Sequence, residues 1–210
     1  MLMITIGAAL VASIGLTGAA GAHDKPDKPA GAPKDITRQT LPDGSAGDDA
    51  AAERYFTNTE LIDQNGRAHR FYADLLRGKK VLINFAFTSC SGACPTMTSN
   101  LARAQKLLDE KTRKELTFIT ISVDPVNDTP AALKAFATKL KVGPSWYFLT
   151  GTPANVEAVL RRLGGHTSKP SEHLSTLLVG SLSTGHWLKS TATEQPERIA
   201  YLARHIDDAR

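Results

Sequence analysis

Cys90 and Cys94 are the only two cysteines in this 210-residue chain, and they lie between a predicted strand and a predicted helix. Residues 81–87 form a short apolar run rich in residues that favour strands, which predicts a buried strand. Apolar residues recur after the cysteines at helical spacing, and Pro95 suits the first position of a helix, where its missing N–H would have no partner anyway. These apolar residues are Met97, Leu101, Ala104 and Leu108. The sequence therefore predicts a strand-to-helix loop that carries both cysteines, with Cys94 at the N-cap and Gly92 allowing a tight turn.

This position predicts reactive sulfur atoms. A helix N-terminus carries partial positive charge and free N–H groups, which stabilise a thiolate over a thiol. We therefore expect the pKa of Cys94 to fall, and that of Cys90 with it. Two accessible thiolates can exchange with disulfides or hold a soft metal ion. The alternative is a plain structural disulfide, which would close a very short loop and remove little chain entropy.

The other apolar runs alternate between strand and helix patterns, which predicts an α/β fold with a central mixed sheet flanked by helices. We expect an N-terminal β-hairpin, with a strand over 55–62, a turn at 63–66 and a return strand near 67–71. Further strands are predicted at 116–123, 146–149, 175–179 and 185–188. Helices are predicted to begin at Thr129-Pro130, Thr152-Pro153 and Gln195-Pro196.

Size and charge narrow the class of protein. A chain of 210 residues has room for one domain with a sizeable core. Its 25 basic residues are interleaved with 21 acidic ones and form no continuous stripe, so nucleic-acid binding is not expected. Two cysteines also exclude a disulfide-rich scaffold.

The N-terminal 52 residues predict a leader followed by a linker. Residues 1–22 contain no charged residue, and an apolar core precedes Ala20-Gly21-Ala22, which fits a signal-peptide cleavage site. Because the usual basic residues before that core are missing, a retained membrane anchor is the competing interpretation. Residues 23–52 are rich in proline, glycine and charged residues and predict a flexible linker before a domain at 53–210. Either interpretation places the domain outside the cytoplasm, in the periplasm, where thiols oxidise unless a reductase or a metal protects them.

Three motifs, separated along the chain, combine into one pattern. They are Phe87-Thr88-Ser89-Cys90 with Cys94-Pro95, Ser122-Val123-Asp124-Pro125 with Asp128-Thr129-Pro130, and Trp146-Tyr147-Phe148-Leu149-Thr150-Gly151-Thr152. This pattern resembles the Sco/SenC family of copper-handling proteins, over residues 55–205 or thereabouts. The resemblance implies a thioredoxin-like fold, although thioredoxins carry two residues between their cysteines and this chain carries three.

In that family the metal is held by both cysteines and by a histidine that lies far downstream, just before a strand. The matching residue is His173, so the resemblance implies a copper ion bound by Cys90, Cys94 and His173. Two thiolates and one imidazole suit Cu(I) and can also hold Cu(II). The implied role is a metallochaperone for the binuclear copper site of cytochrome c oxidase subunit II, with a thioredoxin-like protein as reductant. The alternative is a thiol–disulfide oxidoreductase that uses Cys90 and Cys94 as its redox pair, a role that needs no histidine at this place.

Three positions depart from the family pattern. Ser91 stands where proline is usual, Leu174 where serine is usual, and Gly180 where an Asp-Pro turn usually begins. The first two leave the implied ligands in place but alter the loop, and the third changes the local turn. The remaining domain histidines carry no motif and are expected on the surface or in the scaffold: His69, His166, His186 and His205. Asp124 and Asp128 either fix the turn that follows their strand or contact a partner or the cysteine loop.

Overall fold

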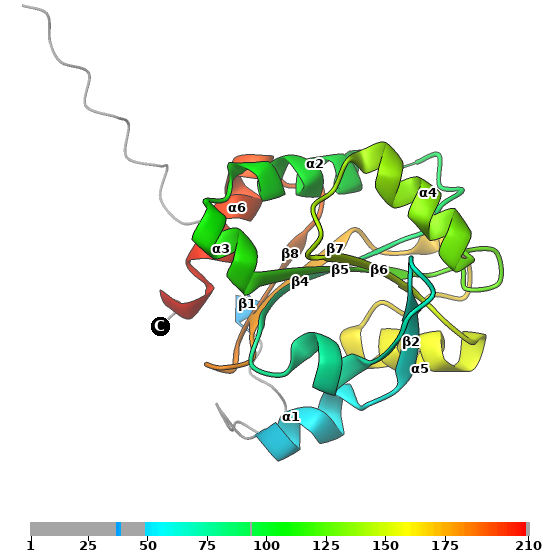
Figure 1. Ribbon diagram of the computed structural model, residues 1–210, viewed down its shortest axis with the longest axis horizontal. Coiled ribbons are helices and arrows are strands. Elements are labelled where there is room, and N and C mark those ends of the chain that lie inside the picture. The colour runs from blue at the N-terminus through cyan, green and yellow to red at the C-terminus, as the bar shows by residue number, and fades with distance from the viewer. Residues whose placement is uncertain (1–36, 39–48, 93, 209–210) are drawn as a thin grey trace, which may run out of the picture. The chain divides into compact units, whose positions relative to one another are not determined.

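A computed structural model of the chain describes residues 37–38, 49–92 and 94–208. Its centre is a mixed sheet of eight strands in the order β1-β8-β7-β4-β5-β6-β2-β3 (Figure 1). The strands are β1 (Thr37–Arg38), β2 (Glu60–Asp63), β3 (Ala68–Arg70), β4 (Lys80–Ala86), β5 (Leu116–Ser122), β6 (Trp146–Thr150), β7 (Thr176–Ser181) and β8 (His186–Thr191). Strands β4, β5 and β6 are parallel to one another, and the other neighbouring strands pair antiparallel.

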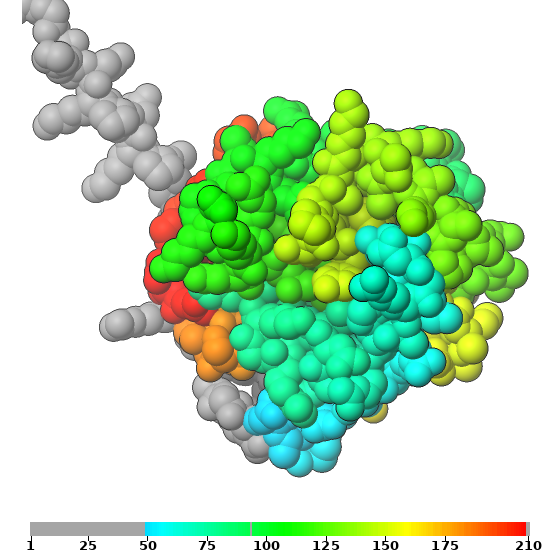
Figure 2. Space-filling model, viewed as in Figure 1, coloured from blue at the N-terminus to red at the C-terminus, as the bar shows by residue number. Residues whose placement is uncertain are grey.

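Helices cover both faces of this sheet. One face carries α2 (Cys94–Leu107), α4 (Pro130–Leu140) and α6 (Pro196–Arg204), and the other carries α1 (Asp49–Phe56) and α5 (Pro153–Leu163) (Figure 1). The shorter helices are η1 (Phe71–Leu76), α3 (Glu110–Glu115), η2 (Pro170–Glu172) and η3 (Ile206–Asp208). Side chains fill the gaps that the ribbon drawing leaves between these elements (Figure 2).

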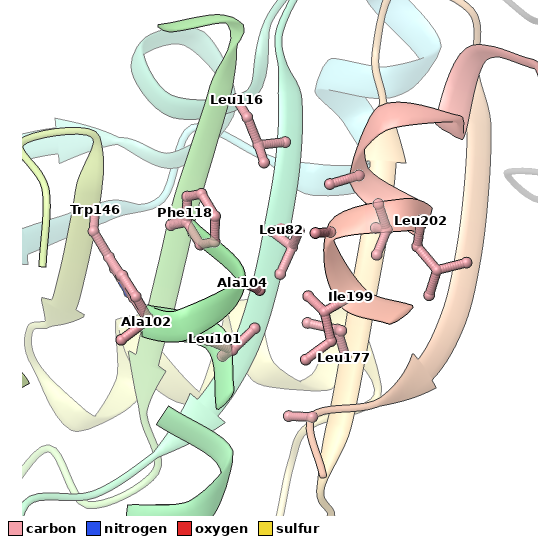
Figure 3. Packing of buried hydrophobic residues seen from close by; sticks show 14 of the residues in the cluster. Leu82, Leu101, Ala102, Ala104, Leu116, Phe118, Trp146, Leu177, Ile199 and Leu202 are labelled. Carbon is pink, nitrogen blue, oxygen red and sulfur yellow. The ribbon is translucent and has the colours of Figure 1, made fainter. Parts of the chain in front are cut away.

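Each face of the sheet has its own hydrophobic core, because successive side chains of a strand point to opposite faces. Leu82 of β4 packs in one cluster together with Leu101 of α2 and Ile199 of α6 (Figure 3). Its neighbours Val81 and Ile83 belong to the opposite cluster, which includes residues of α1, η1 and α5. Strand β5 is buried along its whole length. The central strands therefore give the loops at their ends a rigid base.

Two helix starts that the sequence predicts are confirmed. Thr129 Oγ1 accepts a hydrogen bond from the N–H of Ala132 at 3.2 Å, and Pro130 is in the first turn of α4. Thr152 caps α5 in the same way by accepting from the N–H of Asn155 at 3.2 Å. Such a cap pairs an N–H that the helix itself leaves without a partner. The loop between β5 and α4 therefore has a fixed end.

The strand predicted over residues 55–62 is wrong in its first half. The chain up to Phe56 belongs to helix α1, Thr57 follows with a positive φ of 63°, and β2 begins only at Glu60. An aromatic residue favours a strand, but Phe56 packs into the core on the α5 face, and this tertiary contact outweighs local propensity. The predicted hairpin itself is confirmed, with β2 and β3 paired around a turn at residues 63–66.

Part of the linker predicted at 23–52 belongs to the fold. Strand β1 pairs with β8, and α1 begins at Asp49 with Ala51 and Ala52 buried. The predicted leader at 1–22 and most of the linker lie outside the described residues. None of the helices in the described ranges combines the length and apolarity that a bilayer crossing needs. The predicted α/β class, with a mixed sheet flanked by helices, is confirmed.

Gly180, which departs from the family pattern, is explained by packing across two strands. It lies in β7 opposite Trp187 of β8, and a Cβ at this position would meet the indole ring at 2.5 Å. Glycine lets the ring lie directly over the backbone. Strand β7 consequently continues to Ser181, where the sequence predicts an end at Val179.

Candidate metal centre

Cys90 lies where the sequence predicts, on the loop between β4 and α2, whereas Cys94 is the first residue of α2, one position further into the helix than the predicted N-cap. Helix α2 begins at Cys94, whose carbonyl accepts a hydrogen bond from Thr98 Oγ1 at 2.7 Å. Cys94 is 0% exposed, whereas Cys90 is half-buried and the next two residues, Ser91 and Gly92, are exposed. Both cysteines are free thiols. The pair thus offers one sulfur anchored at a helix start and one near the surface.

Sheet topology brings His173 to the cysteines, although it lies 79 positions beyond Cys94. Strand β7 runs antiparallel to β4, with Leu177 opposite Asn84. The segment that leads into β7 therefore lies beside the segment that leaves β4. His173 follows η2 directly and belongs to that leading segment.

The potential ligand atoms of these three residues converge. The two sulfur atoms and the imidazole nitrogen all lie within 4.8 Å of one another, and Cys94 Sγ is 3.0 Å from Nε2 of His173. Nδ1 of His173 donates a hydrogen bond to the carbonyl of Leu174 at 3.2 Å. This bond leaves the lone pair of Nε2 facing the sulfur. One metal ion could therefore take both sulfurs and Nε2 as ligands.

An aromatic contact holds the other side of the imidazole. The ring of Phe87 meets the ring of His173 edge to face, with centroids 5.7 Å apart and planes at 88°. Phe87 is half-buried and packs against the core on the α5 face. The imidazole is therefore located by a hydrogen bond at Nδ1, a sulfur at Nε2 and an aromatic ring at its side.

The predicted fall in the pKa of Cys94 is wrong for the metal-free protein. Burial of the sulfur, together with its hydrogen bond to Cys90, raises the pKa of Cys94 to about 12. Removal from water favours the neutral thiol, and this effect outweighs the backbone N–H groups of Phe87 and Cys94, which lower the pKa. Burial also lowers the pKa of His173, so its imidazole is neutral at pH 7 and available as a ligand. A bound cation would have to displace the proton of Cys94.

Asp128 contacts the cysteine loop, one of the interpretations that the sequence leaves open. Its carboxylate is 1% exposed and accepts hydrogen bonds from the N–H of Thr88 at 3.1 Å and from the hydroxyls of Thr88 at 2.5 Å and Ser122 at 2.6 Å. Asp124 accepts from the side chain of the asparagine three residues later, at 3.0 Å, and so fixes its own turn. The two aspartates of the second motif therefore have different roles.

The remaining histidines of the described chain do not belong to the group formed by the two cysteines and His173. His69 contacts Asp63 at 3.0 Å, His166 lies 4.0 Å from Glu157, His205 contacts Asp208 at 2.8 Å, and His186 lies in β8. Their predicted place in scaffold or surface agrees with these contacts.

Sequence reasoning assigns no role to Phe87 or Thr88, although both belong to the first motif. Their contacts cross to His173 and Asp128, which lie 86 and 40 positions away (173 − 87 and 128 − 88). The available signal was the motif itself, since an aromatic and a hydroxyl residue directly precede the cysteine loop. Periodicity could not reveal which distant residues they meet.

Known proteins share both the sequence pattern and the fold. Residues 47–179 match the SCO1/SenC family. A SCO2-like protein of Rickettsia conorii is 37% identical over 100 residues, which cover 48% of this chain and 46% of that protein. The chain spans about half the length of the curated relatives it matches.

Two solved structures show the same arrangement of elements. ScoI of Bradyrhizobium japonicum with copper bound is 28% identical, with a TM-score of 0.55 over 70% of this chain and 96% of that chain. BsSco, described as a member of the Sco family of cytochrome c oxidase assembly proteins with a disulfide switch, is 27% identical, with a TM-score of 0.59 over 72% and 92%. The predicted thioredoxin-like fold is confirmed by these neighbours. The chain belongs to the SCO1/SenC family.

Proposed function

We propose that this protein is an extracytoplasmic copper metallochaperone that holds one copper ion through Cys90, Cys94 and His173. The observation that carries the proposal is the convergence of two sulfurs and one imidazole nitrogen within 4.8 Å of one another. Thiolate and imidazole ligands suit copper, and Cu(I) in particular favours soft sulfur. The similarity to a copper-bound ScoI supports the choice of metal.

The differing burial of the ligands supports transfer of the ion, not only storage. Cys94 is buried, while Cys90 and His173 are half-buried, and the two residues after Cys90 are exposed. A ligand from an acceptor protein would meet the copper ion on this open side. Three protein ligands leave a coordination position for that incoming group, so the ion can be exchanged stepwise. We propose as acceptor the binuclear copper site of cytochrome c oxidase subunit II, in keeping with the oxidase-assembly role described for BsSco.

Copper binding by single-site variants tests the first part of this proposal. The reduced domain should bind one copper ion, Cys90→Ser and Cys94→Ser should lose it, and His173→Ala should bind more than about 100-fold more weakly. His166→Ala is a control, because His166 is an exposed histidine outside the group. Equal affinity of wild type and His173→Ala would remove the third ligand and, with it, the metallochaperone.

Transfer needs its own measurement. Two equivalents of Cu(I)-loaded protein mixed with the soluble copper-site domain of an oxidase should, after one-electron oxidation by added ferricyanide, generate the absorption of the binuclear centre, and copper-free protein should not. A loaded protein that keeps its copper in the presence of excess acceptor would contradict the proposed destination.

A thiol–disulfide oxidoreductase is the second candidate, and the two adjacent free cysteines favour it. One cysteine would attack a disulfide of a partner and the other would resolve the mixed disulfide, with a thioredoxin-like protein returning both to the thiol form. Turnover with a disulfide substrate should depend on both Cys90 and Cys94. Turnover that survives Cys90→Ser would exclude this role.

The proposed location rests on residues 1–22, which resemble a signal peptide or an anchor. Mass spectrometry of the mature protein from a periplasmic extract separates the two. An N-terminus at His23 indicates cleavage, whereas an intact Met1 in the membrane fraction indicates an anchor.

A further inference from the structure

The buried carboxylate of Asp128 joins two segments that lie 40 residues apart. It accepts from the backbone N–H and the hydroxyl of Thr88, at the start of the cysteine loop. On its other side it accepts from Ser122 at the end of β5, at 2.6 Å. Hydrogen bonds to an ionised carboxylate are shorter and stronger than neutral ones. The carboxylate thus fastens the start of the loop to the end of a central strand.

The position of Cys90 depends on this contact more strongly than the positions of Cys94 and His173 do. Cys94 is fixed by helix α2, and His173 is fixed at both ring nitrogens and at one side by Phe87. Cys90 lies outside any helix or strand, and its own N–H bonds to the carbonyl of Phe87 at a long 3.3 Å. Two residues before it, Thr88 is held by Asp128.

A role confined to the local turn does not explain Asp128. The cap of helix α4 is supplied by Thr129, whose own hydroxyl accepts from Ala132. No ion pair within the described ranges includes Asp128, so the partners of its carboxylate are hydroxyl and amide donors. Burying a carboxyl group is costly, and a hydrophobic residue would cost less at a purely structural site.

We propose that Asp128 is a positioning residue of the metal centre, which acts through Thr88 to hold the sulfur of Cys90 within ligand distance of Cys94 and His173. This inference rests on the proposed copper function. It predicts that loss of the carboxylate loosens the loop and weakens copper binding, although Asp128 itself does not touch the ion. Partners that orient metal ligands from outside the coordination sphere typically change affinity by about 10- to 100-fold when removed.

The test measures Cu(I) affinity by competition with a chelator of known affinity, alongside the unfolding midpoint of the copper-free protein. Asp128→Ala should bind Cu(I) at least about tenfold more weakly. Asp128→Asn should lie between, because its amide oxygen still accepts from Thr88. Thr88→Val should also weaken binding, and the double variant should bind no more weakly than Asp128→Ala alone, because both changes break one contact. Asp63→Asn is the matched control, since Asp63 is another buried, hydrogen-bonded carboxylate, in the β2–β3 hairpin.

The outcomes separate this inference from the proposed function. If wild type binds copper and both Asp128→Ala and Thr88→Val bind it within twofold of wild type, the positioning role is overturned. It is also overturned if Asp63→Asn weakens binding as much, because general destabilisation would then explain the loss. Should Asp128→Ala fail to fold, Thr88→Val decides. Should wild type bind no copper, the proposed function fails, and hydrogen exchange of the Thr88 N–H decides the inference. This N–H should exchange at least tenfold faster in Asp128→Asn and Asp128→Ala than in wild type. Unchanged exchange overturns the positioning role.

Discussion

The edge-to-face contact between Phe87 and His173 makes a quantitative prediction about copper affinity. Replacing Phe87 with leucine removes the ring but keeps a side chain that fills part of its place in the core. It also keeps the backbone N–H of residue 87, which hydrogen-bonds the sulfur of Cys94. The change therefore removes the aromatic support of the imidazole and leaves both cysteine ligands as they are.

The size of the effect follows from the value of the ring pair. With centroids 5.7 Å apart and planes at 88°, the pair has the preferred edge-to-face geometry, which contributes about 0.5–1.5 kcal/mol beyond its buried area. Removing this contact lowers copper affinity only to the extent that the contact holds the His173 ring in its binding position in the copper-free protein. Its full value is therefore an upper limit, which corresponds to about 2- to 13-fold in the dissociation constant.

A chelator competition for Cu(I) provides the assay, with Phe136→Leu as the matched control. Phe136 of α4 also makes an edge-to-face pair, with Phe148 at 5.9 Å and 81°, on the opposite face of the sheet from the core that Phe87 joins. Both variants should lose similar stability, but only Phe87→Leu should lose affinity. The reasoning is refuted if Phe87→Leu binds as tightly as wild type, or if Phe136→Leu loses as much affinity.

Three further changes have defined outcomes. Gly180→Ala should destabilise the protein by about 1–3 kcal/mol, because the added Cβ would collide with the Trp187 ring. The loss should be smaller in a Trp187→Leu background, and thermal unfolding of the single and double variants measures the difference. Burial opposes ionisation of Asp63, but its hydrogen bonds, chiefly with His69, outweigh this and hold its pKa below the usual value. The stability gained from this carboxylate is therefore present above pH 4 or so and lost as the pH falls through the lowered pKa. The free energy of unfolding measured in urea should be larger for wild type than for Asp63→Asn at pH 7, and the two values should converge near pH 2. Leu174→Ser should leave copper affinity within twofold of wild type, because Leu174 is 58% exposed and contacts His173 through its backbone carbonyl. The chelator competition would show any larger change.

Local patterns in the sequence were enough to predict most of the fold. The β4 strand, the Thr-Pro helix starts and the hairpin turn each depend on neighbouring residues, and each is confirmed. The helix at Asp49–Phe56 was not predicted, because its alanines and aromatics carry a weak helical pattern and its stability comes from packing against η1 and α5. Strand β1 is two residues long and has no periodicity to detect.

The candidate site shows a similar division. Spacing alone placed Cys90 and Cys94 on their loop, but only the family resemblance pointed to His173, since 79 intervening residues carry no local signal. The pKa of Cys94 went the other way from the prediction because sequence shows the helix N-terminus and does not show burial. The contact between Thr88 and Asp128 likewise depends on the parallel pairing of β4 with β5, which brings the ends of both strands together.

Because the two candidate functions use the same two sulfur atoms, one molecule cannot perform both at the same time. A disulfide requires sulfurs about 2.05 Å apart and consumes both thiolates, so an oxidised pair has none left to hold copper. In either role an incoming group reaches Cys90 before Cys94, because Cys94 is fully buried and Cys90 is only half-buried. Cys90 is therefore the sulfur that meets an incoming disulfide or an incoming ligand first, and Cys94 is the one that resolves the mixed disulfide or releases the ion last. A reductant that restores the two thiols would serve both roles, because reduction must precede copper binding.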